Sequence, residues 1–168
     1  LATWHAEAFA LDGARIVAAL RDRRDHLVEV AERYFALINR RADVLGSSHA
    51  DAFDLWFLGG GAVRVTVGPR AKGEAVPPPY FDRVYQPGET AELNLYALAG
   101  DDALVVHGEP TTAMTIRFVG GVGHDTVAAA PGPGPGAIDA SAIALYDSEE
   151  GASVDPSIVV RDERSSVA

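Results

Sequence analysis

The chain has 168 residues, of which 48% are hydrophobic and 23% are charged, enough to bury one ordinary core with a small helical appendage. Its formal net charge is −10, which disfavours nucleic acid and anionic membranes because both repel an acidic surface. The absence of cysteine excludes a disulfide framework, a thiolate zinc site and a cysteine nucleophile. No signal peptide or membrane helix is predicted, since no long apolar run is present.

Two helices are predicted between Asp12 and about Arg41, because apolar residues recur there at helical spacing. Asp12 and Asp25 stand where N-cap carboxylates would accept hydrogen bonds from free backbone N–H groups. The two apolar stripes consist of Ile16, Val17 and Leu20, and of Leu27, Val30, Ala31, Tyr34, Leu37 and Ile38. We therefore predict an N-terminal helical pair within residues 1–48.

A β-hairpin is predicted after this pair. The segment FDLWFL (53–58), a Gly59–Gly61 turn and AVRVTV (62–67) read as two strands, with alternate valines on one face. Trp56 and Phe57 are expected to pack in the core or between elements. The proline-rich stretch at 69–79 is expected to be an irregular connector.

The second half of the chain contains an internal repeat. The segments LNLYALAGDDALVV and TIRFVGGVGHDTVA align at a constant offset of 23 residues, and a shorter echo follows at 143–147. The aligned pairs are Leu93 with Ile116, Leu95 with Phe118, Gly100 with Gly123, Asp102 with Asp125, and Leu104 with Val127. Such a repeat indicates supersecondary units that stack on their neighbours, with their Gly-Asp corners aligned.

These features predict an α+β fold in which the helical pair packs on a β-rich body over residues 49–168. A short β-solenoid resembling a β-roll is favoured, and a β-sandwich is the alternative. A second irregular loop is expected at 131–136, where proline and glycine alternate, and SIVV (157–160) is expected to form a final strand.

The stretch FVGGVGHDTV (118–127) fits the calcium-turn pattern G-G-x-G-x-D-x-U. If the two corners stack, their carboxylates and glycine carbonyls supply the oxygen ligands that calcium prefers. The hypothetical calcium ligands are Asp101, Asp102, Gly121, Gly123 and Asp125. The preferred interpretation is a tight corner, in which glycine allows positive φ and aspartate accepts hydrogen bonds from turn amides. Calcium is the second interpretation, and no other cofactor is expected.

Catalytic motifs are absent from the sequence, and the chain is therefore expected not to be an enzyme. None of the five histidines falls in a metal-binding grouping such as H-E-x-x-H. No nucleophile elbow and no phosphate-binding glycine loop is present. A hydrolase using His107, His124 and Asp125 is the third and least favoured alternative.

The order of segments resembles a region found in large bacterial envelope proteins. The resemblance is carried by the arginine-rich helices, LYALAGDDALVV, IRFVGGVGHD and LYD. In those proteins a metallophosphoesterase or kinase-like region often precedes this segment, and a surface-antigen type outer-membrane barrel follows it. The resemblance implies a periplasmic or surface-side module without catalytic residues of its own.

The function expected from the sequence is therefore that of a non-enzymatic structural or interaction module. It would space, dock or cap neighbouring domains of the same polypeptide, or contact other envelope proteins. The location implied by the resemblance is the periplasm or the outer-membrane surface, with no membrane insertion by this segment.

Overall fold

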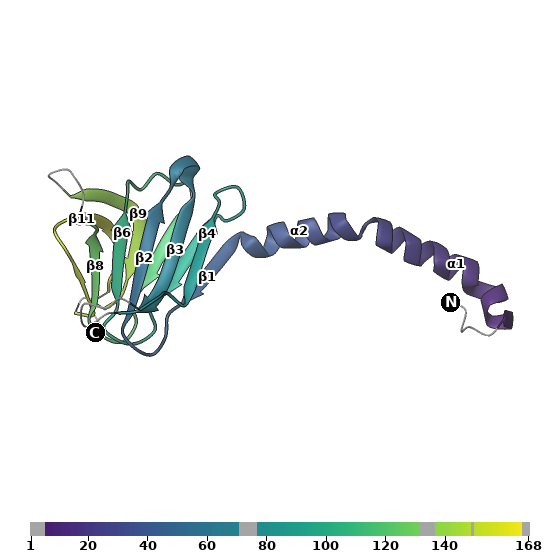
Figure 1. Ribbon diagram of the computed structural model, residues 1–168, viewed down its shortest axis with the longest axis horizontal. Coiled ribbons are helices and arrows are strands. Elements are labelled where there is room, and N and C mark those ends of the chain that lie inside the picture. Colours follow the sequence, from purple (N-terminus) through teal and green to yellow (C-terminus); the bar gives the residue numbers. More distant parts are fainter. Residues whose placement is uncertain (1–5, 71–76, 132–136, 149, 166–168) are drawn as a thin grey trace. The chain divides into compact units, whose positions relative to one another are not determined.

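The computed structural model describes residues 6–70, 77–131, 137–148 and 150–165, and Figure 1 shows its elements. The chain divides into two compact units, the first ending at Ile38 and the second beginning at Asn39. The first unit is helical and the second consists of two β-sheets. The predicted α+β class is confirmed.

The helical unit contains α1 (Ala6–Asp25) and α2 (Leu27–Asn39). Asp12 lies inside α1, where it forms a salt bridge with Arg15 at 3.0 Å, so its prediction as an N-cap was wrong. The helix begins earlier because the alanine-rich segment before Asp12 has high helix propensity. None of the helices in the described part of the chain has the length and hydropathy needed to span a bilayer.

The β body begins earlier than residue 49, because the chain enters a strand directly after α2. This strand, β1 (Arg41–Leu45), pairs in parallel with β5 (Glu92–Tyr96). The end of the predicted helical segment at residue 48 is therefore corrected to Ile38. The packing of the helical pair on the β body concerns two separate units and stays a prediction.

Two sheets form the β body. Sheet A contains, in spatial order, β1, β5, β7 (Thr115–Val119), β9 (Ile138–Tyr146) and β11 (Ile158–Asp162). Sheet B contains β10 (Ala152–Val154), β8 (Asp125–Ala129), β6 (Ala103–His107), β2 (Asp51–Phe57), β3 (Val63–Pro69) and β4 (Phe81–Tyr85).

After β4, successive strands of the chain alternate between the two sheets. From β5 onward each strand of sheet A is followed by one of sheet B, and all pairs between successive turns are parallel. This is the connectivity of a two-sheeted solenoid, in which one strand from each sheet makes one coil. The predicted short solenoid is the arrangement that forms.

The predicted hairpin is confirmed as β2 and β3, joined by a short 3-10 turn at Gly59–Gly61. Val63, Val65 and Val67 are fully buried, as the alternation predicted. A third strand, β4, extends the hairpin at the edge of sheet B, directly after the stretch predicted to be an irregular connector. Residues 71–76 of that connector and 132–136 of the second predicted loop lie outside the described residues.

The repeat register agrees with the sequence alignment. Leu93 lies opposite Ile116 and Leu95 opposite Phe118 on neighbouring strands, and the third echo places Leu145 opposite Phe118. These side chains are fully buried between the sheets, where Phe118 meets Phe53 edge to face with ring centroids 5.7 Å apart. The apolar interior therefore runs continuously from coil to coil. The predicted final strand is also present, as β11.

Candidate functional site

The connections from sheet A to sheet B form a regular stack at one end of the coils, which we call the corner stack. Its members are residues 46–51 (GSSHAD), 97–102 (ALAGDD), 120–125 (GGVGHD) and the described residues of 147–152 (DSEEGA), which exclude residue 149. The strand residues on either side of all four corners are in register with one another. This corner therefore has the same number of residues in every coil.

Backbone geometry explains the glycines of the corner stack. Gly100 and Gly123 have φ values of 125° and 149°, in the region that favours glycine. A Cβ added to Gly123 would overlap the carbonyl of Gly100, and one added to Gly100 would lie 2.6 Å from the carbonyl carbon of His49. Gly100 N also donates to Val122 O at 2.9 Å. The predicted equivalence of the two Gly-Asp bends is thereby confirmed as direct stacking.

Three aspartates occupy the same place in successive corners and face the interior. Asp51, Asp102 and Asp125 are 1%, 0% and 1% exposed. Asp51 N donates to Asp102 Oδ1 at 2.6 Å, and Asp102 N donates to Asp125 Oδ1 at 2.8 Å. The carboxylates of Asp102 and Asp125 thus accept a backbone hydrogen bond from the preceding corner, whereas that of Asp51 accepts one from Ser47 N of its own corner. Each bond satisfies an amide that would otherwise be buried without a partner.

In the fourth corner the aspartate and the small residue that face the interior exchange their positions. In the first three corners the small residues Gly46, Ala97 and Gly120 precede the aspartate by five positions. In the fourth corner Asp147 takes the place of the small residue, and Ala152 takes the place of the aspartate. A Cβ added to Gly120 would overlap Oδ2 of both Asp125 and Asp147. The absence of a side chain at Gly120 therefore creates the space in which two carboxyl groups meet.

Burial raises the pKa of Asp102 and of Asp125 to about 6, against the opposing effect of the backbone hydrogen bond that each accepts. The negative charges of neighbouring carboxylates contribute to the rise of both pKa values. Burial together with the charge of Asp51 raises the pKa of Tyr80 to about 12. Among the described residues, three buried side-chain oxygens have no hydrogen-bond partner: Oδ2 of Asp102, of Asp125 and of Asp147.

The carboxylates among the five hypothetical calcium ligands lie on both sides of the corner stack. Asp101 is exposed on the outside of its corner, where its Oδ1 accepts a hydrogen bond from His124 N at 3.0 Å, whereas Asp102 and Asp125 face inward. Gly121 and Gly123 provide positive φ. The described part of the chain contains no cluster of three or more His, Asp or Glu side chains suited to a metal ion. Calcium binding by the corner stack stays a prediction.

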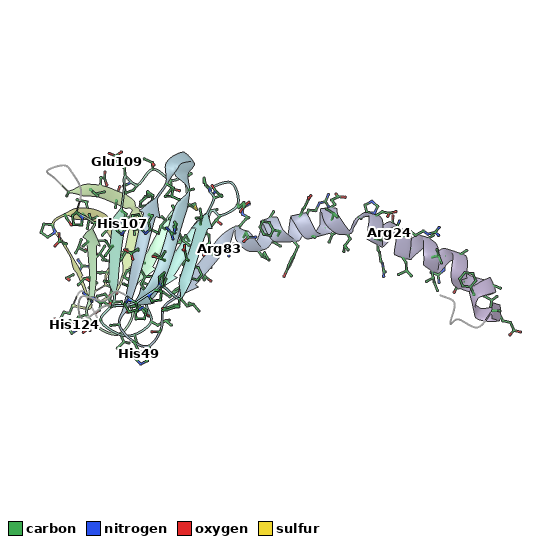
Figure 2. All side chains as sticks on the ribbon, in the orientation of Figure 1. Arg24, His49, Arg83, His107, Glu109 and His124 are labelled. Carbon is green, nitrogen blue, oxygen red and sulfur yellow. The ribbon has the colours of Figure 1, made fainter. Side chains whose placement is uncertain are left out.

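The three residues of the hydrolase alternative are also separated. His107 ends β6, whereas Asp125 begins the parallel neighbour β8, and Figure 2 shows His107 and His124 at opposite ends of the sheet. His107 Nε2 instead pairs with Asp54 Oδ1 at 2.7 Å, and its ring stacks on Trp56 at 3.6 Å between centroids. Trp56 is 38% exposed on the outer face of sheet B, where it packs on His107 of the neighbouring strand, and Phe57 packs against the core. Of the two predicted settings, Trp56 therefore has packing between elements and Phe57 has the core.

Sequence reasoning missed Asp51, Asp54 and Asp147. Asp54 meets His107 only through the parallel pairing of β2 with β6, which links residues 53 positions apart. Asp51 and Asp147 were missed because the offset of 23 residues does not extend to their corners, as the pairing of Ala52 with Ala103 and of Ile116 with Ile143 shows.

Comparison with known proteins gives no relatives. No family model matches the sequence, and neither a curated protein nor a solved structure resembles it significantly.

Proposed function

We propose that the chain is a non-enzymatic structural or interaction module of a bacterial envelope protein that spaces or docks neighbouring domains. The observation that supports this proposal most directly is the two-sheeted solenoid itself. Its interior is filled by apolar side chains, and the histidine and aspartate residues that a hydrolase would need lie apart. The envelope location is supported by the sequence resemblance and by the net charge of −10.

A solenoid suits spacing because its length grows by one strand separation, about 4.8 Å, with every coil. It also suits docking, because the outer edges of β1 and β11 in sheet A and of β4 and β10 in sheet B have no neighbouring strand in the sheets as described. Unpaired edges can accept another strand through main-chain hydrogen bonds.

The helical unit offers a second docking surface. Within that unit α2 has no buried residue, and its apolar side chains Leu27, Tyr34 and Leu37 are 63%, 64% and 68% exposed. A one-sided apolar helix is stabilised chiefly by packing against a partner. The docking role predicts that Leu37→Glu weakens association of the parent polypeptide's neighbouring domains, whereas Glu32→Gln on the opposite face does not.

The spacing role is tested by removing one whole coil from the parent polypeptide. Deleting residues 92–114 joins Ala91 to Thr115, which is in register with Glu92, so the remaining coils can re-pair. The distance between fluorophores on the flanking domains should fall by about 4.8 Å with retained folding. An unchanged distance in a folded deletion variant, or recovery of the parent protein in the cytosolic fraction, would contradict the proposal.

Calcium stiffening of the corner stack is the alternative function. Its supporting observation is the direct stacking of Gly100 and Gly123. A ligand bound only to the folded state raises the melting temperature by mass action. Millimolar calcium should therefore raise the melting temperature and a chelator should lower it if this alternative holds.

A further inference from the structure

The apolar surface of the helical unit follows a heptad repeat. With Leu20 at position a of a heptad a–g, the a and d positions from residue 9 to residue 37 are 9, 13, 16, 20, 23, 27, 30, 34 and 37. Only Gly13 and Arg23 among them lack a large apolar side chain. We call this stripe the heptad seam. An apolar repeat at a and d over about four heptads is typical of a coiled coil, in which each helix packs its stripe against that of another helix.

The heptad phase continues from α1 into α2. His26 lies between the two helices; its backbone N–H donates to Asp22 O at 3.1 Å, and its O accepts from Val30 N at 3.0 Å. Both bonds join residues four positions apart, as in an α-helix, so the chain does not turn back between α1 and α2. The helical unit therefore does not cover its own heptad seam as a helical hairpin would.

The heptad seam is open to solvent within the helical unit. Its large apolar residues include several that are 41% to 68% exposed, namely Phe9, Leu20, Leu27, Val30, Tyr34 and Leu37. Short helices are marginally stable in water unless an apolar face packs against a partner, and a contiguous apolar patch marks an interaction site. A partner is therefore needed along the whole heptad seam rather than at one point of it.

The charges that flank the heptad seam form ion pairs within each helix. Asp12 pairs with Arg15 at 3.0 Å in α1. Glu29 pairs with Arg33 at 2.6 Å in α2, and all four residues lie at positions c and g. The two helices also carry little net charge, since they contain six acidic residues and five arginines within a chain of net charge −10. Two copies of these helices therefore meet without the repulsion that the overall charge of the chain imposes elsewhere.

We propose that the helical unit forms a coiled coil with the helical unit of a second copy of this chain. A second copy presents a stripe of the same period and length, so the apolar layers of the two helices match along their whole length. A sheet of the β body does not match the heptad seam, because side chains along a strand repeat every two residues and the apolar core of that body is already enclosed between its two sheets. The inference rests on the docking role proposed for the helical unit and names its partner.

Arg23 is the only charged residue at an a or d position of the heptad seam. In a coiled coil of copies every helix contributes this arginine at a position that favours an apolar side chain, which lowers the stability of the assembly. Arg23→Leu should therefore tighten self-association by about tenfold or more. Against a different helix with an acidic residue at the same level, this substitution would weaken binding instead.

The experiment is sedimentation equilibrium of the 168-residue chain over a wide range of concentrations, with thermal denaturation followed by circular dichroism. The wild type should form a discrete oligomer, and its helical signal should melt at a higher temperature as the concentration rises. Leu27→Glu, at position a, should weaken self-association by about 100-fold or more. The matched control Glu32→Gln, at position f on the opposite face, should change neither the oligomer nor the melting.

The inference is overturned if the wild type sediments as a monomer at every concentration. It is also overturned if an oligomer forms that Leu27→Glu leaves intact, because the heptad seam would then not be the interface. An unchanged unfolding transition of the β body in each variant shows that the substitutions act on association and not on folding. If self-association fails while Leu37→Glu still weakens the association of neighbouring domains, the docking role stands with a different partner.

Discussion

The two ends of the coils obey different constraints. At the corner stack every connection from sheet A to sheet B has the same length, and its inward positions hold one aspartate and one small residue. The connections from sheet B to sheet A differ in length. They include residues 86–91, which follow the inserted hairpin, residues 108–114 in the next coil and residues 155–157 in the last coil. The connections therefore have a constant length at the corner stack and a variable length at the opposite end of the coils.

The physical cause is close backbone approach at the corner stack. Successive corners touch through glycine and carbonyl groups, and a buried carboxylate receives the amide of the neighbouring corner. A change in one corner therefore displaces the next. The described residues of the connections at the other end include no row of buried aspartates, so an added residue there costs mainly loop-closure entropy.

The largest expected effect comes from inserting one glycine after Val122. The insertion shifts the inward alternation of β8 by one residue and removes Asp125 from the aspartate row, so cooperative unfolding of the third and fourth coils is expected. The same insertion after Glu109, in the connection 108–114, should cost less than about 0.6 kcal/mol. Urea denaturation measures both. Equal losses for the two insertions would remove the distinction between the ends.

A smaller but still large effect is expected for Gly123→Ala. The new Cβ would overlap the carbonyl of Gly100, and φ at this position is 149°. The loss of unfolding free energy should be about 3 kcal/mol. The matched control is Gly59→Ala at the other end, where a Cβ meets no atom within 4 Å, and a change below about 0.5 kcal/mol is expected. Comparable destabilisation by both substitutions would contradict the close-approach argument.

The smallest expected effect is an increase in the free energy of unfolding. Leu98 occupies the position equivalent to Gly121 and has a φ of 73° although it is not glycine. Because its side chain is 46% exposed, little burial is lost on removing it. Leu98→Gly should therefore raise the unfolding free energy by about 0.5 to 1 kcal/mol, and Leu58→Gly, which has φ of −107°, should not. A destabilised Leu98→Gly variant would show that the strain at this corner is absent.

The sequence patterns predicted the corner stack better than the opposite end of the coils. The offset of 23 residues correctly paired Leu95 with Phe118 and Asp102 with Asp125, because stacking imposes the same residues at the same spacing. The first coil was missed because its corner, GSSHAD, is separated from the second by the inserted β3–β4 hairpin, and β1 continues directly from a helix. Local periodicity does not reveal either feature.

The candidate site was predicted only in part. The Gly-Asp corners were expected to align, and they do, but no sequence pattern indicated that Asp101 turns outward while Asp102 turns inward toward its neighbour. Alternation along a strand requires opposite directions for adjacent side chains, but the strand boundary sets which of the two faces the interior. Asp147 was recognised only as the last residue of the shorter echo at 143–147, because its exchange with Ala152 becomes visible only through the pairing of β9 and β10.

The most direct test of the stacked corners is a cysteine pair at Ala99 and Val122, which form a parallel bridge between successive corners. The chain has no native cysteine, so the readout is unambiguous. Neighbouring strands lie about 4.8 Å apart, within the range of a disulfide. Mild oxidation should cross-link this pair within one chain and raise the melting temperature. Efficient cross-linking of the shifted pair Ala99→Cys and His124→Cys, with none between positions 99 and 122, would contradict the register on which the account depends.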